Sequence, residues 1–215
     1  MYNSKVHLDF DNLPTFESTP LFFTLDDQVD ARLRTLPATY ARCNSALRFM
    51  SNIGADSDHM HVRAEEIASM RVAYLRASLM EFVGMEEALR IDLGRDQVPL
   101  RISDTRSAML VVLRELRNVQ IHLIKTDLLS GKRSAVSRFR GEEHEHELTA
   151  LTIPRLDLDR VKDARNAAYC HREDLERAVD WLAEAQEHWG IADVVMRGIW
   201  AYAEAIVAVH VPLVA

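Results

Sequence analysis

Apolar positions recur at spacings of three and four over most of the chain, the period of helices that bury one face. This pattern is clearest between about residues 58 and 93, where the apolar stripe is wide enough to be covered by more than one neighbour. Pro37 should kink or split the first helix, and Gly94, Gly131 and Gly190 should end later ones. The pattern predicts five helices, at about 24–53, 58–93, 103–129, 157–188 and 191–211.

Two stretches lack this period. Residues 1–23 carry two prolines among scattered aromatics, which predicts an extended N-terminal arm packed onto the body of the protein. Residues 132–154 are polar and are expected to form a long loop. The sequence therefore predicts an all-α fold, a bundle of four or five mainly antiparallel helices, with residues 24–215 as a single helical-bundle domain behind the arm.

Composition agrees with a single core, since 48% of the 215 residues are hydrophobic and only 7 are Gly and 6 are Pro. Cys43 and Cys170 lie far apart without CxxC spacing, so neither a disulfide framework nor a cysteine zinc site is indicated, and a reducing cytoplasm fits. No segment resembles a signal peptide. The apolar run at 199–214 contains Glu204 and His210, so we expect no membrane span.

The charge is unevenly distributed. The chain carries a formal net charge of −7, which argues against non-specific coating of nucleic acid. Residues 93–140, however, carry ten arginines and lysines against four acids, a local net charge of +6. This basic segment is either a local anion-binding site or a set of arginines paired with acids elsewhere in the fold.

Within that segment, the run Arg117-Asn118-Val-Gln-Ile-His122 lies on the predicted third helix. At about 100° per residue, Asn118 and His122 fall roughly opposite the apolar stripe, together with Arg114 and Lys125. Asn118 and His122 are four residues apart, so the amide can hold the imidazole, and Arg117 is long enough to reach the same side. The stripe itself consists of Met109, Val112, Leu113, Leu116, Val119 and Leu123.

This run resembles the Arg-x(4–6)-His motif of HEPN-domain proteins, in which Asn often follows the Arg. Many HEPN proteins are helical-bundle, metal-independent ribonucleases of toxin–antitoxin, abortive-infection and CRISPR systems. The resemblance implies a homodimer in which motifs from two subunits meet in one cleft. It also implies that Arg117 binds the scissile phosphate, that His122 transfers protons and that Asn118 orients His122.

Such chemistry needs neither metal nor cofactor, because RNA supplies its own nucleophile in the 2′-hydroxyl. Imidazole titrates near neutrality and guanidinium is a fixed bidentate partner of phosphate. The sequence thus favours an endoribonuclease that uses Arg117, Asn118 and His122, with Arg114 and Lys125 binding substrate and an antitoxin or other regulatory protein as a further partner. The alternative is a non-catalytic helical-bundle module, a degenerate HEPN domain that binds RNA or a protein.

Two further runs contain histidines beside polar or charged residues. The run from Arg165-Asn166 to His171 is a second near-match, but helical geometry places His171 in the apolar stripe of its helix, which favours a packed, hydrogen-bonded histidine. The run Glu142–Glu147 holds two histidines and four glutamates. It lacks the spacing that puts two histidines on one helix face, so a solvated acidic loop is favoured over a metal site.

Overall fold

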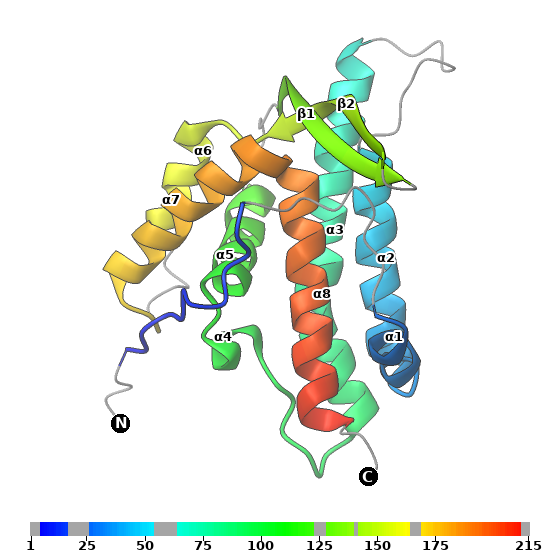
Figure 1. Cartoon of the computed structure of the whole chain (residues 1–215). Coiled ribbons are helices and arrows are strands. Elements are labelled where there is room, and N and C mark those ends of the chain that lie inside the picture. The colour runs from blue at the N-terminus through cyan, green and yellow to red at the C-terminus, as the bar shows by residue number, and fades with distance from the viewer. Residues whose placement is uncertain are drawn as a thin grey trace.

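The computed structural model describes residues 5–16, 26–53, 64–122, 128–139, 142–163 and 169–211. These ranges fold mainly into helices, which confirms the all-α bundle. Figure 1 shows α2, α3 and α8 as long neighbouring helices, with α5 beside α8. The helices are α1 (Asp27–Leu33), α2 (Pro37–Ile53), α3 (Ala64–Leu93), α4 (Ile102–Thr105), α5 (Ala108–His122), α6 (Arg155–Asp159), the 3-10 helix η1 (Arg160–Asp163), α7 (Arg172–Trp189) and α8 (Ile191–His210).

Helix α5 is packed against several other elements. It packs against α3, α7, α8 and η1. All six residues at its start, 108–113, are buried, so this part of the helix is enclosed on every side and not along one stripe. Among the described helices, none has both the length and the apolar character needed to cross a membrane.

The expected polar loop at 132–154 is instead an antiparallel hairpin of β1 (Leu129–Phe139) and β2 (Glu142–Thr152). Its open end is fixed to the helices, because the Gln186 side-chain amide both donates to and accepts from the backbone of Ile153, at 2.8 Å each. Gly190 lies against the backbone of Ala150 and has a φ of +81°, a conformation that residues with a side chain rarely adopt. These contacts hold the hairpin across one end of the bundle (Figure 1).

The predicted helix at 103–129 is wrong at both ends. Leu129 begins strand β1, which also contains Gly131, the expected helix terminator. At the start, the N-terminal arm interrupts the helix. Arg106 takes a left-handed conformation, with φ of 55°, between α4 and α5. Its carbonyl accepts a hydrogen bond from Asp9 N, and Ala108 N donates to Asp9 O. Ser107 Oγ then accepts from Leu110 N and caps α5.

The predicted helix at 157–188 is also wrong, and the arm is again involved. Val6 N donates to Tyr169 O, and His171 N donates to Val6 O, so the backbone of this stretch pairs with the arm instead of continuing a helix. The described part of the arm is therefore extended and packed on the body, as expected. Helix α7 begins only at Arg172.

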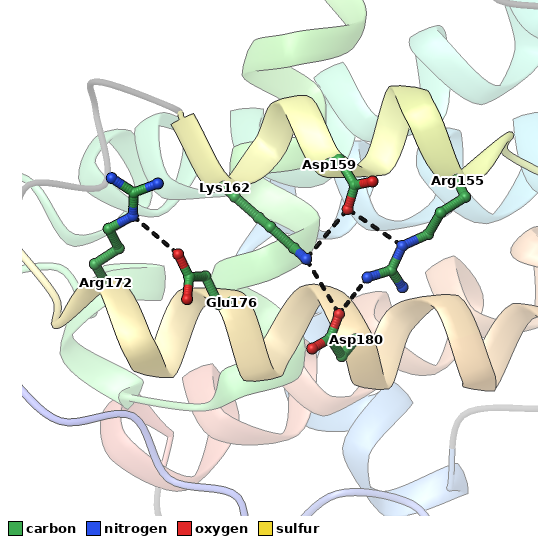
Figure 2. A network of polar contacts seen from close by, with 6 residues as sticks. All are labelled: Arg155, Asp159, Lys162, Arg172, Glu176 and Asp180. Atoms are coloured by element: carbon green, nitrogen blue, oxygen red, sulfur yellow. Dashed lines mark hydrogen bonds and ion pairs between the residues drawn. The ribbon is translucent and has the colours of Figure 1, made fainter.

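Ion pairs fasten α6 and η1 to α7, as Figure 2 shows. Asp180 on α7 pairs with both Arg155 and Lys162, and Asp159 pairs with the same two cations. Arg172 and Glu176 form a separate pair on α7. The 3-10 helix η1 also packs against both α5 and α7, which places this segment next to α5.

Candidate functional site

The site begins with a chain of two hydrogen bonds on α5. Arg117 Nη1 donates to Asn118 Oδ1 at 3.1 Å, and Asn118 Nδ2 donates to Glu115 Oε2 at 3.0 Å. The expectation that Arg117 reaches the side of Asn118 is confirmed. The structure therefore brings two of the three predicted catalytic residues into contact and adds a carboxylate to them.

The expected outward face of this helix is wrong for its described part. Arg114, Arg117 and Asn118 are all half-buried. Helical geometry placed Asn118 away from the apolar stripe, but α5 packs against α7 and η1 as well as α3 and α8, so its burial is not confined to that stripe. This burial was missed because part of it comes from η1, which lies some forty residues further along the chain.

Glu115 is a residue that the sequence prediction did not select, and it is fully buried, with 0% of its surface exposed. Burial raises the pKa of its carboxyl, while the Asn118 hydrogen bond and the Arg114 charge partly offset that rise. Its other oxygen, Oε1, finds no hydrogen-bond partner among the described residues. A signal was present, because Val111, Val112 and Val119 flank Glu115 at helical spacing, which is unusual for a solvent-facing acid.

Tyr169 adds a second buried polar group. The Arg114 guanidinium lies over its ring, 5.5 Å from the ring centre, within the range of a cation–π contact. Burial, and then the charge of Glu115, raise the pKa of the Tyr169 hydroxyl, so it stays protonated. That hydroxyl is buried and has no hydrogen-bond partner within the described part of the chain. Arg114, expected to bind substrate, thus also packs against the segment that covers α5.

Some predicted residues fall outside the described part of the chain. His122 is the last residue of α5, one turn after Asn118, but its side chain is not among those described. Lys125 lies outside the described residues altogether, as do Arg165 and Asn166 of the second near-match. Their roles stay predictions.

His171 does not lie in the stripe of a continuous helix, which corrects the expectation for it. It is half-buried, precedes α7 as its N-cap and stacks on His7, with ring centres 3.9 Å apart. His7 Nδ1 lies 3.0 Å from Asp174 Oδ2, and the same oxygen accepts from Leu8 N. This cluster serves to hold the arm on α7.

The side chains of Glu142–Glu147 lie outside the described part, although their backbone forms β2. The expectation of a loop is therefore corrected to a strand. Among the described residues, no group of three or more His, Cys, Asp or Glu side chains is placed to hold a metal ion.

Chemically, the α5 cluster joins a permanent cation to an amide whose orientation is fixed, next to a buried carboxylate. The guanidinium keeps further N–H donors that can bind a phosphate oxygen. Because a guanidinium cannot exchange protons near neutrality, proton transfer would need an additional group such as an imidazole. No protein-family model, curated protein or solved structure matches this chain.

Proposed function

We propose that this protein is a metal-independent endoribonuclease of HEPN type, with Arg117, Asn118 and His122 at its active centre. The observation that carries the proposal is the hydrogen bond of Arg117 to Asn118, which holds a guanidinium on the helix that carries His122 one turn later. An arginine fixed in this way can bind a phosphate with little loss of side-chain entropy. The local net charge of +6 around it favours a polyanionic substrate.

In the proposed reaction, an imidazole removes the proton of the 2′-hydroxyl, and the oxygen attacks the adjacent phosphorus. The bond from phosphorus to the 5′-oxygen breaks, and an acid returns a proton to that leaving oxygen. Arg117 stabilises the charge that develops on the non-bridging oxygens. The products are a 2′,3′-cyclic phosphate and a 5′-hydroxyl.

The resemblance extends the proposal to a homodimer in which two motifs share one cleft, so that one His122 serves as base and the other as acid. Sedimentation would detect the dimer. A toxin or antiviral effector would also arrest growth on expression, and a regulatory protein would relieve the arrest. Cells that express Arg117→Ala should grow normally. Cells that express Arg95→Ala, a change at an exposed arginine of the same basic segment, should still stop growing.

The reaction class is tested with a DNA oligonucleotide that holds one ribonucleotide, incubated with excess chelator. We expect one cut, directly after the ribonucleotide, with a cyclic phosphate on the upstream product. Cleavage of the all-DNA control, or activity that disappears with chelator, would contradict the proposal. Arg117→Ala should slow the cut by about 100- to 1,000-fold, the effect of removing one donor to a developing oxyanion.

A second candidate is a non-catalytic module that binds RNA or a protein. The half-burial of Arg117 and Asn118 favours it, because both side chains are partly engaged within the fold. A binding module would retain labelled RNA in a filter-binding assay and return it uncut.

A further inference from the structure

Glu115 lies at the inner end of the hydrogen-bonded chain on α5. It is the only fully buried carboxylate among the described residues, since the other buried acids, Asp157, Asp174 and Asp193, each keep 7 to 8% of their surface exposed. Its neighbours at helical spacing are mainly valines. An acid in these surroundings loses hydration that a single hydrogen bond does not replace.

The contacts of Glu115 fix an orientation. An ionised carboxylate only accepts hydrogen bonds, and a guanidinium only donates them. The Asn118 amide between them can therefore point in one direction only, with Nδ2 toward Glu115 and Oδ1 toward Arg117. Through this amide, Glu115 determines the position of Asn118 Oδ1, which accepts the hydrogen bond of the Arg117 guanidinium.

The arrangement is poor for stability. Glu115 Oε1 and the Tyr169 hydroxyl are both buried without hydrogen-bond partners among the described residues. Unpaired buried polar atoms destabilise a fold, and an apolar side chain of similar size would avoid that cost. A group that weakens the fold and orients its neighbours is more easily explained by function than by packing.

We infer that Glu115 is a positioning residue for the reaction, one that holds the Asn118 amide and, through it, the phosphate-binding guanidinium of Arg117. This inference rests on the proposed function. Glu115 touches no substrate in this account and acts through Asn118 alone. It belongs to the site although it cannot be reached from solvent.

Two substitutions separate positioning from packing. Glu115→Gln keeps the shape and an oxygen that accepts from Asn118, so RNA cleavage should keep most of its rate. Glu115→Met fills a similar volume but offers no acceptor, so kcat should fall by about 10- to 100-fold, the effect of a misplaced group in the transition state. RNA affinity should change less, and the thermal midpoint should stay level or rise. Glu176→Met, which removes only a surface pair with Arg172, is the control and should leave cleavage unchanged.

The side-chain amide signals in a ¹⁵N NMR spectrum give a readout that does not depend on cleavage. The Asn118 signal, assigned by its loss in Asn118→Asp, should shift in Glu115→Met and stay nearly in place in Glu115→Gln. The Gln186 amide, clamped on Ile153, is the internal reference and should move in neither.

Two results would overturn the inference. One is an Asn118 side-chain amide signal whose chemical shift is the same in Glu115→Met as in the parent. The other is a Glu115→Met protein that cuts RNA as fast as the parent. If the parent itself cuts no RNA, the proposed function fails. The NMR comparison still decides whether Glu115 orients Asn118.

Discussion

Replacing either of two helical glycines with alanine should change the free energy of unfolding, in opposite directions at the two sites. A Cβ added at Gly198 in α8 would lie 2.2 Å from Leu113 Cδ1, whereas one added at Gly84 in α3 would meet only the Arg42 side chain, at 3.7 Å. Carbon atoms pack at about 3.5–4.0 Å, so Leu113, which is fully buried, would have to move by more than an ångström. Only the Gly198 substitution therefore disturbs the core.

The magnitude follows from two terms. Alanine is favoured over glycine inside a helix by about 1 kcal/mol, and this gain applies to both sites. Overpacking a core costs about 1–3 kcal/mol and applies to Gly198 alone. Gly84→Ala should thus raise the free energy of unfolding by up to about 1 kcal/mol, and Gly198→Ala should lower it by about 0–2 kcal/mol. The difference between the two variants isolates the packing term, because the helix-propensity term cancels.

Urea unfolding followed by circular dichroism measures both variants, with equal slopes expected. The thermal midpoint of Gly198→Ala should lie roughly 2–12 °C below that of Gly84→Ala, from a packing difference of about 1–3 kcal/mol at about 2–4 °C per kcal/mol for a chain of this size. Leu113 is one turn before Arg117 on α5, so Gly198→Ala should also slow RNA cleavage, and Gly84→Ala should not. If Gly198→Ala were as stable as Gly84→Ala, the packing of α8 on α5 described above would be wrong.

Three other predictions follow. Burial alone would raise the pKa of Asp174, but hydrogen bonds from Leu8 N and the His7 imidazole hold this pKa below its ordinary value of 3.8. The stabilisation that these hydrogen bonds provide is therefore present above that pH and is lost as the pH falls further. Asp174→Ala should speed hydrogen exchange at the Leu8 amide at neutral pH, and unchanged exchange would show that Asp174 does not hold the arm. Burial raises the pKa of Glu115 above 4.5, so the parent protein must bury a charged carboxylate as the pH rises. The free energy of unfolding of Glu115→Met should therefore increasingly exceed that of the parent from pH 4.5 upward. A difference between the two proteins that does not change with pH would contradict this prediction. Burial also raises the pKa of Cys43 to about 12 and raises that of Cys170, so neither thiol should react with a disulfide reagent at pH 8 until the protein unfolds, and fast labelling of the native protein would contradict the burial of both.

Local signals predicted much of the helical framework. Pro37 does separate α1 from α2, and Gly94 and Gly190, both with positive φ, lie at the end of α3 and between α7 and α8. These boundaries depend on the backbone preferences of single residues, which a sequence shows directly. The hairpin was missed because β2 begins with polar residues on both faces, so it lacks the apolar alternation by which strands are recognised.

The site was predictable only in part. The reach of Arg117 to Asn118 follows from side-chain length and helix geometry, and it could be foreseen. The valines around Glu115 were a signal of its burial that the prediction passed over. The packing of Tyr169 and η1 near α5 could not be foreseen, because it depends on where a distant segment folds back and on how the arm pairs with it. Tertiary contacts of this kind leave little trace in local sequence patterns.

The central claim is that the α5 motif cleaves RNA, and the role of His122 tests it most directly. Single-turnover cleavage of a labelled RNA should be compared in chelator for the parent, His122→Ala and His188→Ala, the last an exposed histidine at the end of α7. We predict that His122→Ala is about 100- to 10,000-fold slower, as expected for loss of a general acid or base, and that His188→Ala matches the parent. A His122→Ala protein that cuts RNA at the parental rate would contradict the account.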